Sequence, residues 1–180
     1  MIKLKDLTVK NFMSVGNVTQ AVDFNKEQLT LVLGENLDQG GDDTGSRNGT
    51  GKTTIINALS YAIYGNALTN IRKDNLINKT NGKAMLVTLD FVKDGTQYRI
   101  ERGRRPNTLK YHVNEQNVDE DEAQGENRNT QDKLDEIIGM SHTMFKHICA
   151  LNTYTEPFLA MKANDQRDFI EELLGITQLS

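Results

Sequence analysis

A short run rich in glycine, lysine and threonine has the residue types needed to bind the phosphates of a nucleotide. The run is Asn48-Gly49-Thr50-Gly51-Lys52-Thr53-Thr54. Its glycines allow the backbone to curl so that successive N–H groups face phosphate oxygens at the positive end of a following helix. Lys52 is predicted to reach the β- and γ-phosphates, and the Thr53 hydroxyl to ligate Mg²⁺. We therefore predict an ATP and Mg²⁺ site in which Lys52 carries the catalytic charge.

The segments on either side of this run are those that a phosphate loop requires. An apolar run, Leu29–Leu33, is predicted to form the strand that leads toward it. Ile55–Tyr64 is predicted to be a helix, because its apolar residues recur at helical spacing. Gly65 then stands where a left-handed residue ends a helix. A chance Gly-Lys-Thr turn is the alternative, and this strand and helix context argues against it.

The spacing departs from the strict phosphate-loop pattern at its first position. That pattern, G-x-x-x-x-G-K-[ST], places Ser46 where a glycine is expected. Gly34 follows the apolar run directly and resembles the usual first glycine. We interpret residues 37–47 as an insertion that loops out of the phosphate cradle, because its glycines and acidic residues favour a solvent loop. A lid over the nucleotide, or a contact with a partner, is the functional alternative for a loop of this length.

Composition limits the class of protein. The chain has 180 residues, which is enough for one domain with a substantial core, and a formal net charge of −4. This charge gives no global attraction to nucleic acid, so any DNA contact must come from a local patch. The single cysteine, Cys149, indicates a reducing compartment and is expected in the core. We find no signal peptide or long apolar span, and expect a soluble, cytoplasmic protein without a membrane partner.

Strands are predicted before and after the phosphate-binding segment. Alternating apolar residues on both sides of Lys93-Asp94-Gly95-Thr96 are a strong β-hairpin signal. The acidic stretch Asp119–Arg128 is expected to be a solvated loop. The predicted strands are Leu4–Val9, Thr19–Phe24, Leu29–Leu33, Met85–Val92, Gln97–Arg102 and Leu109–Val113.

The last third of the chain is predicted to be helical. The predicted helices are Thr130–Ile138, which ends at Gly139; Thr143–Leu151, capped by Ser141; and a segment that begins at Asp165 and carries Phe169, Ile170, Leu173 and Leu174. We expect one α/β domain over residues 1–180. Its predicted parts are a nucleotide-binding core over 1–70, an antiparallel β part over 84–118 and a helical part over 129–180.

Four stretches of the sequence together carry a family resemblance. They are Leu7–Ser14, the phosphate loop with its helix ending in Tyr64-Gly65, Arg99–Gly103, and Phe145-Lys146 leading to Pro157-Phe158-Leu159. They resemble the SbcC-type DNA-repair ATPases, relatives of the SMC proteins. Asn75–Asn81 and Ile137–Ser141 are similar to the T-even-type bacteriophage branch, the large subunit of a recombination endonuclease. The resemblance implies a P-loop NTPase of the ABC/SMC type, and this chain resembles the N-terminal lobe of its head.

The same resemblance implies partners. Such a head is split by a long antiparallel coiled coil, and its C-terminal half supplies a Leu-Ser-Gly-Gly signature and a strand ending in Asp-Glu. Neither segment occurs in this sequence. Family heads form homodimers with ATP sandwiched between them, bind double-stranded DNA, and regulate an SbcD-type nuclease subunit in recombination and double-strand-break repair. This chain alone is therefore expected to bind ATP weakly and to hydrolyse it poorly or not at all.

Two further contacts follow from the resemblance. Family heads carry a glutamine that completes Mg²⁺ coordination, and Asn152 stands at the matching position. An asparagine carbonyl can ligate Mg²⁺ over a shorter reach, and a structural capping role is the alternative. Met13 replaces a basic residue that is usual in the family. Ribose or phosphate contact is therefore assigned to Lys10, Asn11 or Ser14.

One stretch of the sequence is basic, although the net charge of the chain is negative. Its residues are Arg99, Arg102, Arg104, Arg105 and Lys110, of which the last four are the predicted DNA contacts. Family heads place DNA on such lobes, where arginine and lysine contact phosphates regardless of sequence and in a salt-sensitive manner. A solvated strand face is the alternative. The three histidines, His112, His142 and His147, lack metal-ligand spacing.

Two other classes of function remain open for a phosphate loop. A self-contained kinase requires a lid and an acceptor site, and a GTPase usually shows an Asn-Lys-x-Asp segment. Asn78-Lys79-Thr80-Asn81 resembles that segment but lacks its aspartate. A binding module that senses ATP without hydrolysis is a third interpretation of the chain taken alone.

Overall fold

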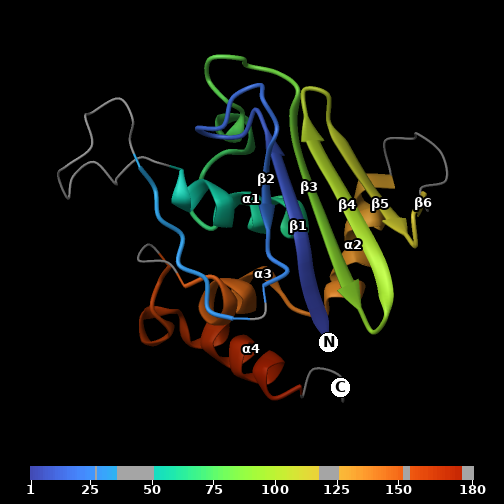
Figure 1. Ribbon diagram of the computed structural model, residues 1–180. Helices are drawn as coiled ribbons and strands as arrows, with labels where there is room; N and C mark the ends of the chain where they lie inside the picture. The colour runs from blue at the N-terminus through green and yellow to red at the C-terminus, as the bar shows by residue number, and fades with distance from the viewer. Residues whose placement is uncertain (27, 36–50, 118–125, 152–154, 176–180) are drawn as a thin grey trace.

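One antiparallel sheet forms the centre of the molecule (Figure 1). The computed structural model describes residues 1–26, 28–35, 51–117, 126–151 and 155–175, and within these ranges the sheet has six strands. Their order in space is β2-β1-β3-β4-β5-β6. The strands are β1 (Ile2–Lys10), β2 (Gln20–Asp23), β3 (Met85–Lys93), β4 (Thr96–Arg104), β5 (Thr108–Val113) and β6 (Gln116–Asn117). The predicted parts 1–70 and 84–118 thus share a single sheet.

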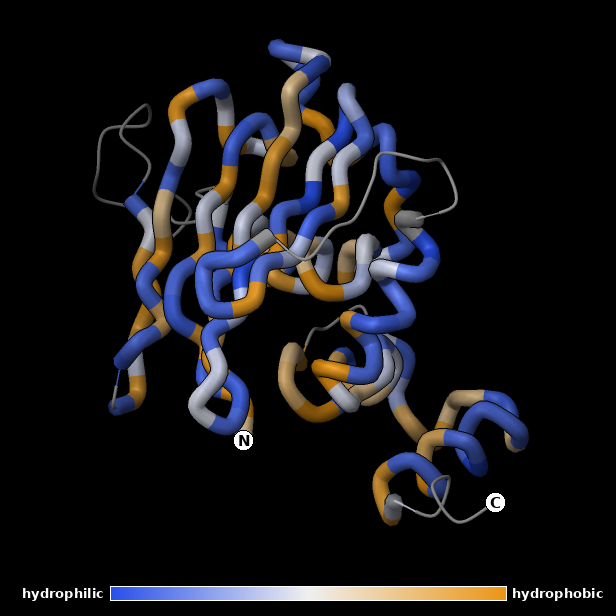
Figure 2. The backbone as a smooth tube through the Cα atoms, turned by 90° about the vertical axis from the view of Figure 1, so that its right-hand side faces the viewer, coloured by the Kyte–Doolittle hydropathy of each residue, from blue (hydrophilic) through white to orange (hydrophobic). Residues whose placement is uncertain are grey.

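The predicted hairpin is confirmed as β3 and β4. Their register pairs Leu89 with Ile100, and both of these side chains are buried. The turn residues Asp94 and Gly95 have φ values of 50° and 84°, the geometry whose twist matches two paired strands. Figure 2 shows hydrophilic and hydrophobic residues alternating along the strands, as expected for a sheet with one buried face.

Helices cover one face of this sheet. α1 (Lys52–Tyr64) packs on β3 and β4, and α2 (Glu126–Ile138) packs on β5. In Figure 1 both helices lie behind the sheet, while α3 (His142–Met144) and α4 (Ala163–Leu173) lie below it. None of the helices in the described ranges is long and apolar enough to cross a membrane.

The core lies between the sheet and α1. Its fully buried members come from every second position of the strands and from one face of the helix, as the repeats of a strand and of a helix require. They include Leu7, Phe12, Val87, Leu89, Phe91 and Ile100 from the strands and their ends, Ala58 and Ala62 from α1, and Leu134 from α2.

The helix ends follow the predicted capping residues. Gly65 ends α1 with φ 69°, and Gly139 follows α2 with φ 66°. The Ser141 side chain accepts a hydrogen bond from the backbone N–H of Met144, as predicted. The second helix is shorter than the predicted span Thr143–Leu151, because α3 continues as one π-helical turn, Phe145–Cys149.

Two predictions are wrong. Leu29–Leu33 is not a strand: it has no pairing partner among the described residues, and the side chains of Leu31 and Leu33 are 79 % and 67 % exposed. Cys149 is exposed rather than buried in the core: it ends the π-helical turn, where its thiol contacts the Met140 sulfur at 3.7 Å. The insertion 37–47 and Asn152 lie outside the described residues.

His142 attaches α3 to α1. Its Nε2 lies 2.9 Å from the Ser60 hydroxyl, which itself donates to the carbonyl of Asn66 at 2.8 Å. The hydroxyl oxygen is therefore the acceptor, and Nε2 carries the proton. The His142 ring also packs against the ring of Tyr64, tilted by 36° with the ring centres 4.9 Å apart. Burial first, and then the charge of Lys146, lowers the pKa of His142 to about 4.

This arrangement predicts a loss of stability in mild acid. In the unfolded chain this histidine has a pKa of about 6.5, whereas in the folded chain its pKa is about 4. The unfolded state therefore binds more protons between these values, and the free energy of unfolding decreases as the pH falls from 6.5 toward 4. The expected loss is about 1–2 kcal/mol after allowance for the partial exposure of the ring. Urea unfolding across that pH range should show the slope in the wild type and a reduced slope in His142→Gln. Equal slopes in both proteins would contradict this assignment.

Candidate nucleotide-binding site

The N-terminus of α1 is built to receive an anion. Gly51 precedes the helix with φ 87° and ψ 5°, a left-handed conformation that glycine adopts without strain. The first turn contains no acidic residue, and no side chain caps it within the described chain. The first N–H groups of a helix have no preceding turn to bond, so a helix N-terminus without a side-chain cap can bind a phosphate. Residues 48–50 of the predicted cradle lie outside the described residues.

Ser14 lies beside this loop, although it is distant in sequence. Its hydroxyl is 3.0 Å from the hydroxyl of Thr54. A Cβ built on Gly51 would lie 3.5 Å from Ser14 Oγ, so the connection after β1 touches the start of α1. Of the contacts expected after β1, Ser14 is therefore next to the phosphate loop.

Asn11 is occupied by structural hydrogen bonds. Its side chain is only 1 % exposed. It donates to Asn17 and to the carbonyl of Ala84, each at 3.2 Å, and accepts from Asn81 at 2.8 Å. These bonds join three chain segments at the end of β1. The side chain that was expected to contact nucleotide therefore supports the loop that holds Ser14.

The two threonines of the motif have different surroundings. Thr53 is exposed, which suits a hydroxyl that must reach a solvated Mg²⁺, whereas Thr54 is buried against Ser14. Lys52, at the first position of α1, is partly exposed. These positions fit the binding of ATP and Mg²⁺: an uncapped helix N-terminus, a lysine and an accessible hydroxyl.

Asn57 supports the site, a role that the sequence analysis did not predict. It is 1 % exposed, donates to the carbonyl of Thr53 at 3.1 Å, and accepts from the backbone N–H of Leu68 at 3.0 Å. The first turn of α1 is thus tied to the segment that follows the helix. The available signal was a polar residue on the apolar face of the predicted helix, where an asparagine needs buried partners.

The predicted DNA contacts do not form one surface. Arg102 is 9 % exposed and points to the helical face of the sheet, where it donates to the carbonyls of Ala62 and Ile63. Arg104 pairs with Asp74 at 2.7 Å. Arg105 is exposed and Lys110 partly exposed. Arg102 is therefore unavailable to a DNA molecule lying on the open surface.

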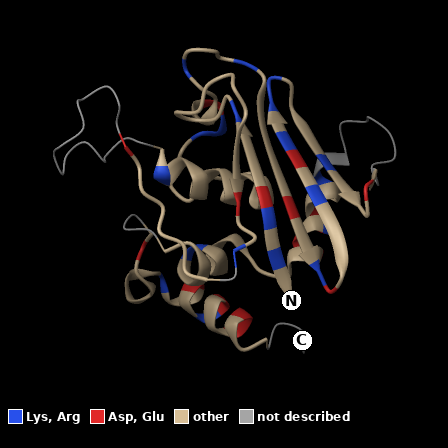
Figure 3. Cartoon of the chain, in the orientation of Figure 1, with Lys and Arg blue, Asp and Glu red and all other residues tan. Residues whose placement is uncertain are grey.

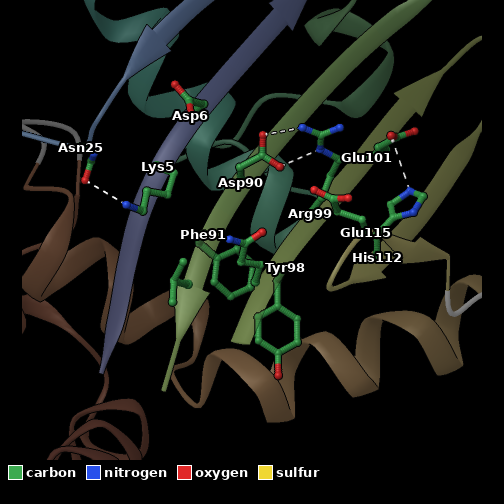
Figure 4. A pocket seen from close by; sticks show the side chains of 12 residues that line it. Lys5, Asp6, Asn25, Asp90, Phe91, Tyr98, Arg99, Glu101, His112 and Glu115 are labelled. Carbon is green, nitrogen blue, oxygen red and sulfur yellow. Dashed lines mark hydrogen bonds and ion pairs between the residues drawn. The ribbon is translucent and has the colours of Figure 1, made fainter. Parts of the chain in front are cut away.

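The open face of the sheet carries mixed charge. Figure 3 shows basic and acidic residues interspersed along its strands. A hollow of about 710 Å³ crosses β1, β3, β4 and β5 (Figure 4). Within it Arg99 makes two hydrogen bonds to Asp90, at 2.6 and 2.9 Å, and His112 lies 3.5 Å from Glu101. The charge of Arg99 is thus compensated, which favours the solvated-face alternative here. No cluster of three metal-ligating side chains occurs among the described residues.

Comparison with known proteins yields consistent relatives. A family profile described as "AAA domain" matches residues 6–179. "Exonuclease subunit 2" of Enterobacteria phage T4 is 33 % identical over 180 residues, which cover 99 % of this chain and 29 % of that protein. The "DNA double-strand break repair Rad50 ATPase" of Methanocaldococcus jannaschii is 27 % identical, over 97 % of this chain and 16 % of that protein. The chain thus spans less than a third of these relatives.

A solved structure supports the fold. The Smc head domain from Pyrococcus furiosus, solved with an extended coiled coil and bound to the C-terminal domain of ScpA, matches with a TM-score of 0.65. The match covers 99 % of this chain and 43 % of that chain, at 18 % sequence identity. The arrangement of strands and helices is therefore that of the N-terminal lobe of an SMC-type head.

Proposed function

Because the chain belongs to the AAA domain family and resembles Rad50-type ATPases over nearly its whole length, we propose that it is the ATP-binding half of an ATPase head. The head is completed by a C-terminal half of the same protein. Two such heads form a homodimer around ATP, bind double-stranded DNA and regulate an SbcD-type nuclease subunit. The assembly acts in recombination and double-strand-break repair, in the host cytoplasm if the protein is encoded by a phage.

The exposed segment Leu29–Leu33 carries this proposal. Four of its five residues are large and apolar, with exposed side chains, and it leads toward the phosphate loop. A chain would not normally leave such a run in water, because each buried leucine contributes about 1.5–3 kcal/mol. A strand from the absent half would pair with this segment and cover it. The 29 % coverage of the phage relative supports the existence of further chain.

The residues of the predicted site have defined roles in this proposal. The N-terminus of α1 and the backbone of residues 48–51 hold the phosphates, and Lys52 compensates the charge that develops on them. Thr53 ligates Mg²⁺, and Ser14 contacts the ribose or a phosphate. The C-terminal half and the second head supply the groups that position the attacking water. Asn152 remains a predicted second Mg²⁺ ligand.

Two alternatives are weaker. A self-contained kinase or GTPase would need to bury its own phosphate-loop strand, whereas Leu29–Leu33 lies exposed. An ATP-sensing module without catalysis describes how the isolated chain is expected to behave. The direct test is to supply the C-terminal half and to follow ATP hydrolysis.

DNA binding is assigned to Arg104, which is partly exposed, and Arg105, which is exposed, at the end of the β4–β5 hairpin. Arg104→Glu with Arg105→Glu should weaken binding to duplexes of unrelated sequence by about tenfold or more, and should reduce the slope of log affinity against log salt by about two. Fluorescence anisotropy over about 50–200 mM salt measures both quantities. Lys79→Glu with Lys133→Glu, at two exposed positions outside this turn, changes the net charge by the same amount and is the control. Unchanged DNA affinity in the double variant would move the DNA surface elsewhere.

A further inference from the structure

A second concave site lies at the opposite end of α1 from the phosphate loop. It is a pocket of about 300 Å³ between the C-terminal end of α1, the strands β4 and β5, and α2. Because α1 has 13 residues, the two sites are about 20 Å apart. Four basic side chains line the pocket: Lys73, Arg102, Arg104 and Arg128.

Arg102 forms the floor of this pocket. It is nine-tenths buried, and its Nε donates to Ala62 at 3.0 Å. Its Nη2 donates to Ile63 at 3.2 Å and to Gln131 at 2.5 Å. Within the described chain these bonds use Nε and Nη2 of the guanidinium, and none uses Nη1. One edge of a buried cation therefore remains available to a ligand.

Gly65 opens the space above that edge. A Cβ built on this residue would lie 2.8 Å from Arg102 Nη1 and 3.7 Å from Lys73 Nζ. Any other residue here would place an atom where these two cations converge. The φ of 69° already favours glycine at the end of the helix, and the absence of a side chain leaves the pocket accessible.

The positive charge of the pocket is only partly compensated. Asp74 pairs with Arg104, whereas Asp135 makes no ion pair with Arg102: it acts on Arg102 through its charge and through hydrogen bonds relayed by Gln131. Burial first, and then the nearby charges of Arg102 and Arg104, lowers the pKa of Lys73. A bound anion would offset this repulsion.

Helix capping explains only part of the arrangement. Cations at a helix C-terminus stabilise its carbonyl groups, and this accounts for Nε and Nη2 of Arg102. It does not account for Lys73 or Arg128, which have no bond to those carbonyls among the contacts of the described residues. These two side chains and Arg102 Nη1 line the same pocket and supply N–H donors of the kind that a phosphate oxyanion accepts from.

We propose that the pocket around Gly65 binds a phosphate group, held by Arg102 Nη1, Lys73 and Arg128. The phosphate comes either from the backbone of a nucleic acid duplex or from a free phosphoanion such as pyrophosphate. The site is separate from the proposed ATP site, and only its DNA form rests on the proposed function.

The test removes the phosphate loop from the measurement. In a Lys52→Ala background, inorganic pyrophosphate is titrated calorimetrically at low salt into proteins that also carry Lys73→Gln, Arg128→Gln or Lys133→Gln. Lys73 and Arg128 are exposed, so neither change should disturb the core, and Lys133 is an exposed control on the same helix as Arg128. Lys73→Gln and Arg128→Gln should each weaken binding about tenfold, the value of one charge-assisted hydrogen bond, and Lys133→Gln should not. Equal affinity in all three proteins would overturn the proposal.

A second arm identifies the source of the phosphate. With Lys52 intact, duplex DNA is titrated into the same variants. A loss of DNA affinity in Lys73→Gln and Arg128→Gln, with each salt slope reduced by about one, assigns the pocket to nucleic acid. Wild-type DNA affinity with weakened pyrophosphate binding assigns it to a free phosphoanion. ATP affinity should remain normal in Lys73→Gln and Arg128→Gln. If the proposed ATP site is wrong, ATP affinity will instead be unchanged by Lys52→Ala, so the two proposals can fail separately.

Discussion

Lys52→Ala should lower the affinity of this chain for ATP by about a hundredfold or more. The lysine is predicted to bond both the β- and γ-phosphates, and each such charge-assisted bond contributes about tenfold or more to affinity. Titration with a fluorescent ATP analogue in the presence of Mg²⁺ measures the loss. Lys79→Ala, which removes one exposed lysine outside the site, is the matched control. Retained affinity in Lys52→Ala would refute the phosphate-loop assignment.

The same titration separates the role of the metal ligand from that of the inserted loop. Thr53→Ala should remove most of the Mg²⁺ dependence of ATP binding, since the exposed hydroxyl is the predicted ligand. Deletion of residues 37–47 should leave ATP affinity largely unchanged, because the insertion is interpreted as looping out of the cradle. Lost binding in the deletion variant would instead make the insertion part of the nucleotide site.

ATP hydrolysis should appear only when a separately produced C-terminal half is added. The chain is proposed to hold the phosphates, and the groups that position the attacking water are proposed to come from the C-terminal half and the second head, so turnover by the chain alone should stay near background. Steady-state hydrolysis with Mg²⁺, measured at several protein concentrations, should rise more steeply than linearly on mixing, because two heads must meet around the nucleotide. Robust turnover by this chain alone, independent of concentration, would indicate a self-contained phosphate-loop enzyme.

The exposed segment provides the internal control for that experiment. Leu31→Asp should prevent reconstitution, because it places a charge where the second half is proposed to pair. The side chain is 79 % exposed, so the substitution should leave the fold of this chain intact. Val18→Asp, at a side chain 74 % exposed after β1, should reconstitute normally. Equal activity in Leu31→Asp and Val18→Asp would show that Leu29–Leu33 is not the docking segment.

Locally encoded features could be predicted from the sequence. The hairpin of β3 and β4 follows from alternation around Asp94-Gly95, and the ends of α1 and α2 follow from Gly65 and Gly139. In each case the signal and its structural consequence lie within a few residues of one another. The helix after the phosphate-binding motif belongs to the same class, because its apolar spacing and its end at Gly65 lie within one short stretch.

Features that depend on distant partners could not be predicted. Leu29–Leu33 has the composition of a strand, but a strand needs a neighbour to bond, and none of the described residues supplies one. Arg102 has the charge of a surface residue, but it is on the buried face of β4 and bonds to a carbonyl of α1. Its burial depends on the carbonyls of a helix some 40 residues earlier.

The sequence by itself determined the phosphate-binding motif, the family and the position of most strands and helices. Only the tertiary structure decided which polar residues are placed to contact a ligand. Ser14 lies beside the phosphate loop, whereas the Asn11 side chain is hydrogen-bonded to other parts of the chain. The tertiary structure also brought Gly65, Lys73, Arg102 and Arg128 around one pocket. Residue type sets what a side chain can bind, but the partners it meets depend on how distant segments pack, and packing is a property of the whole fold.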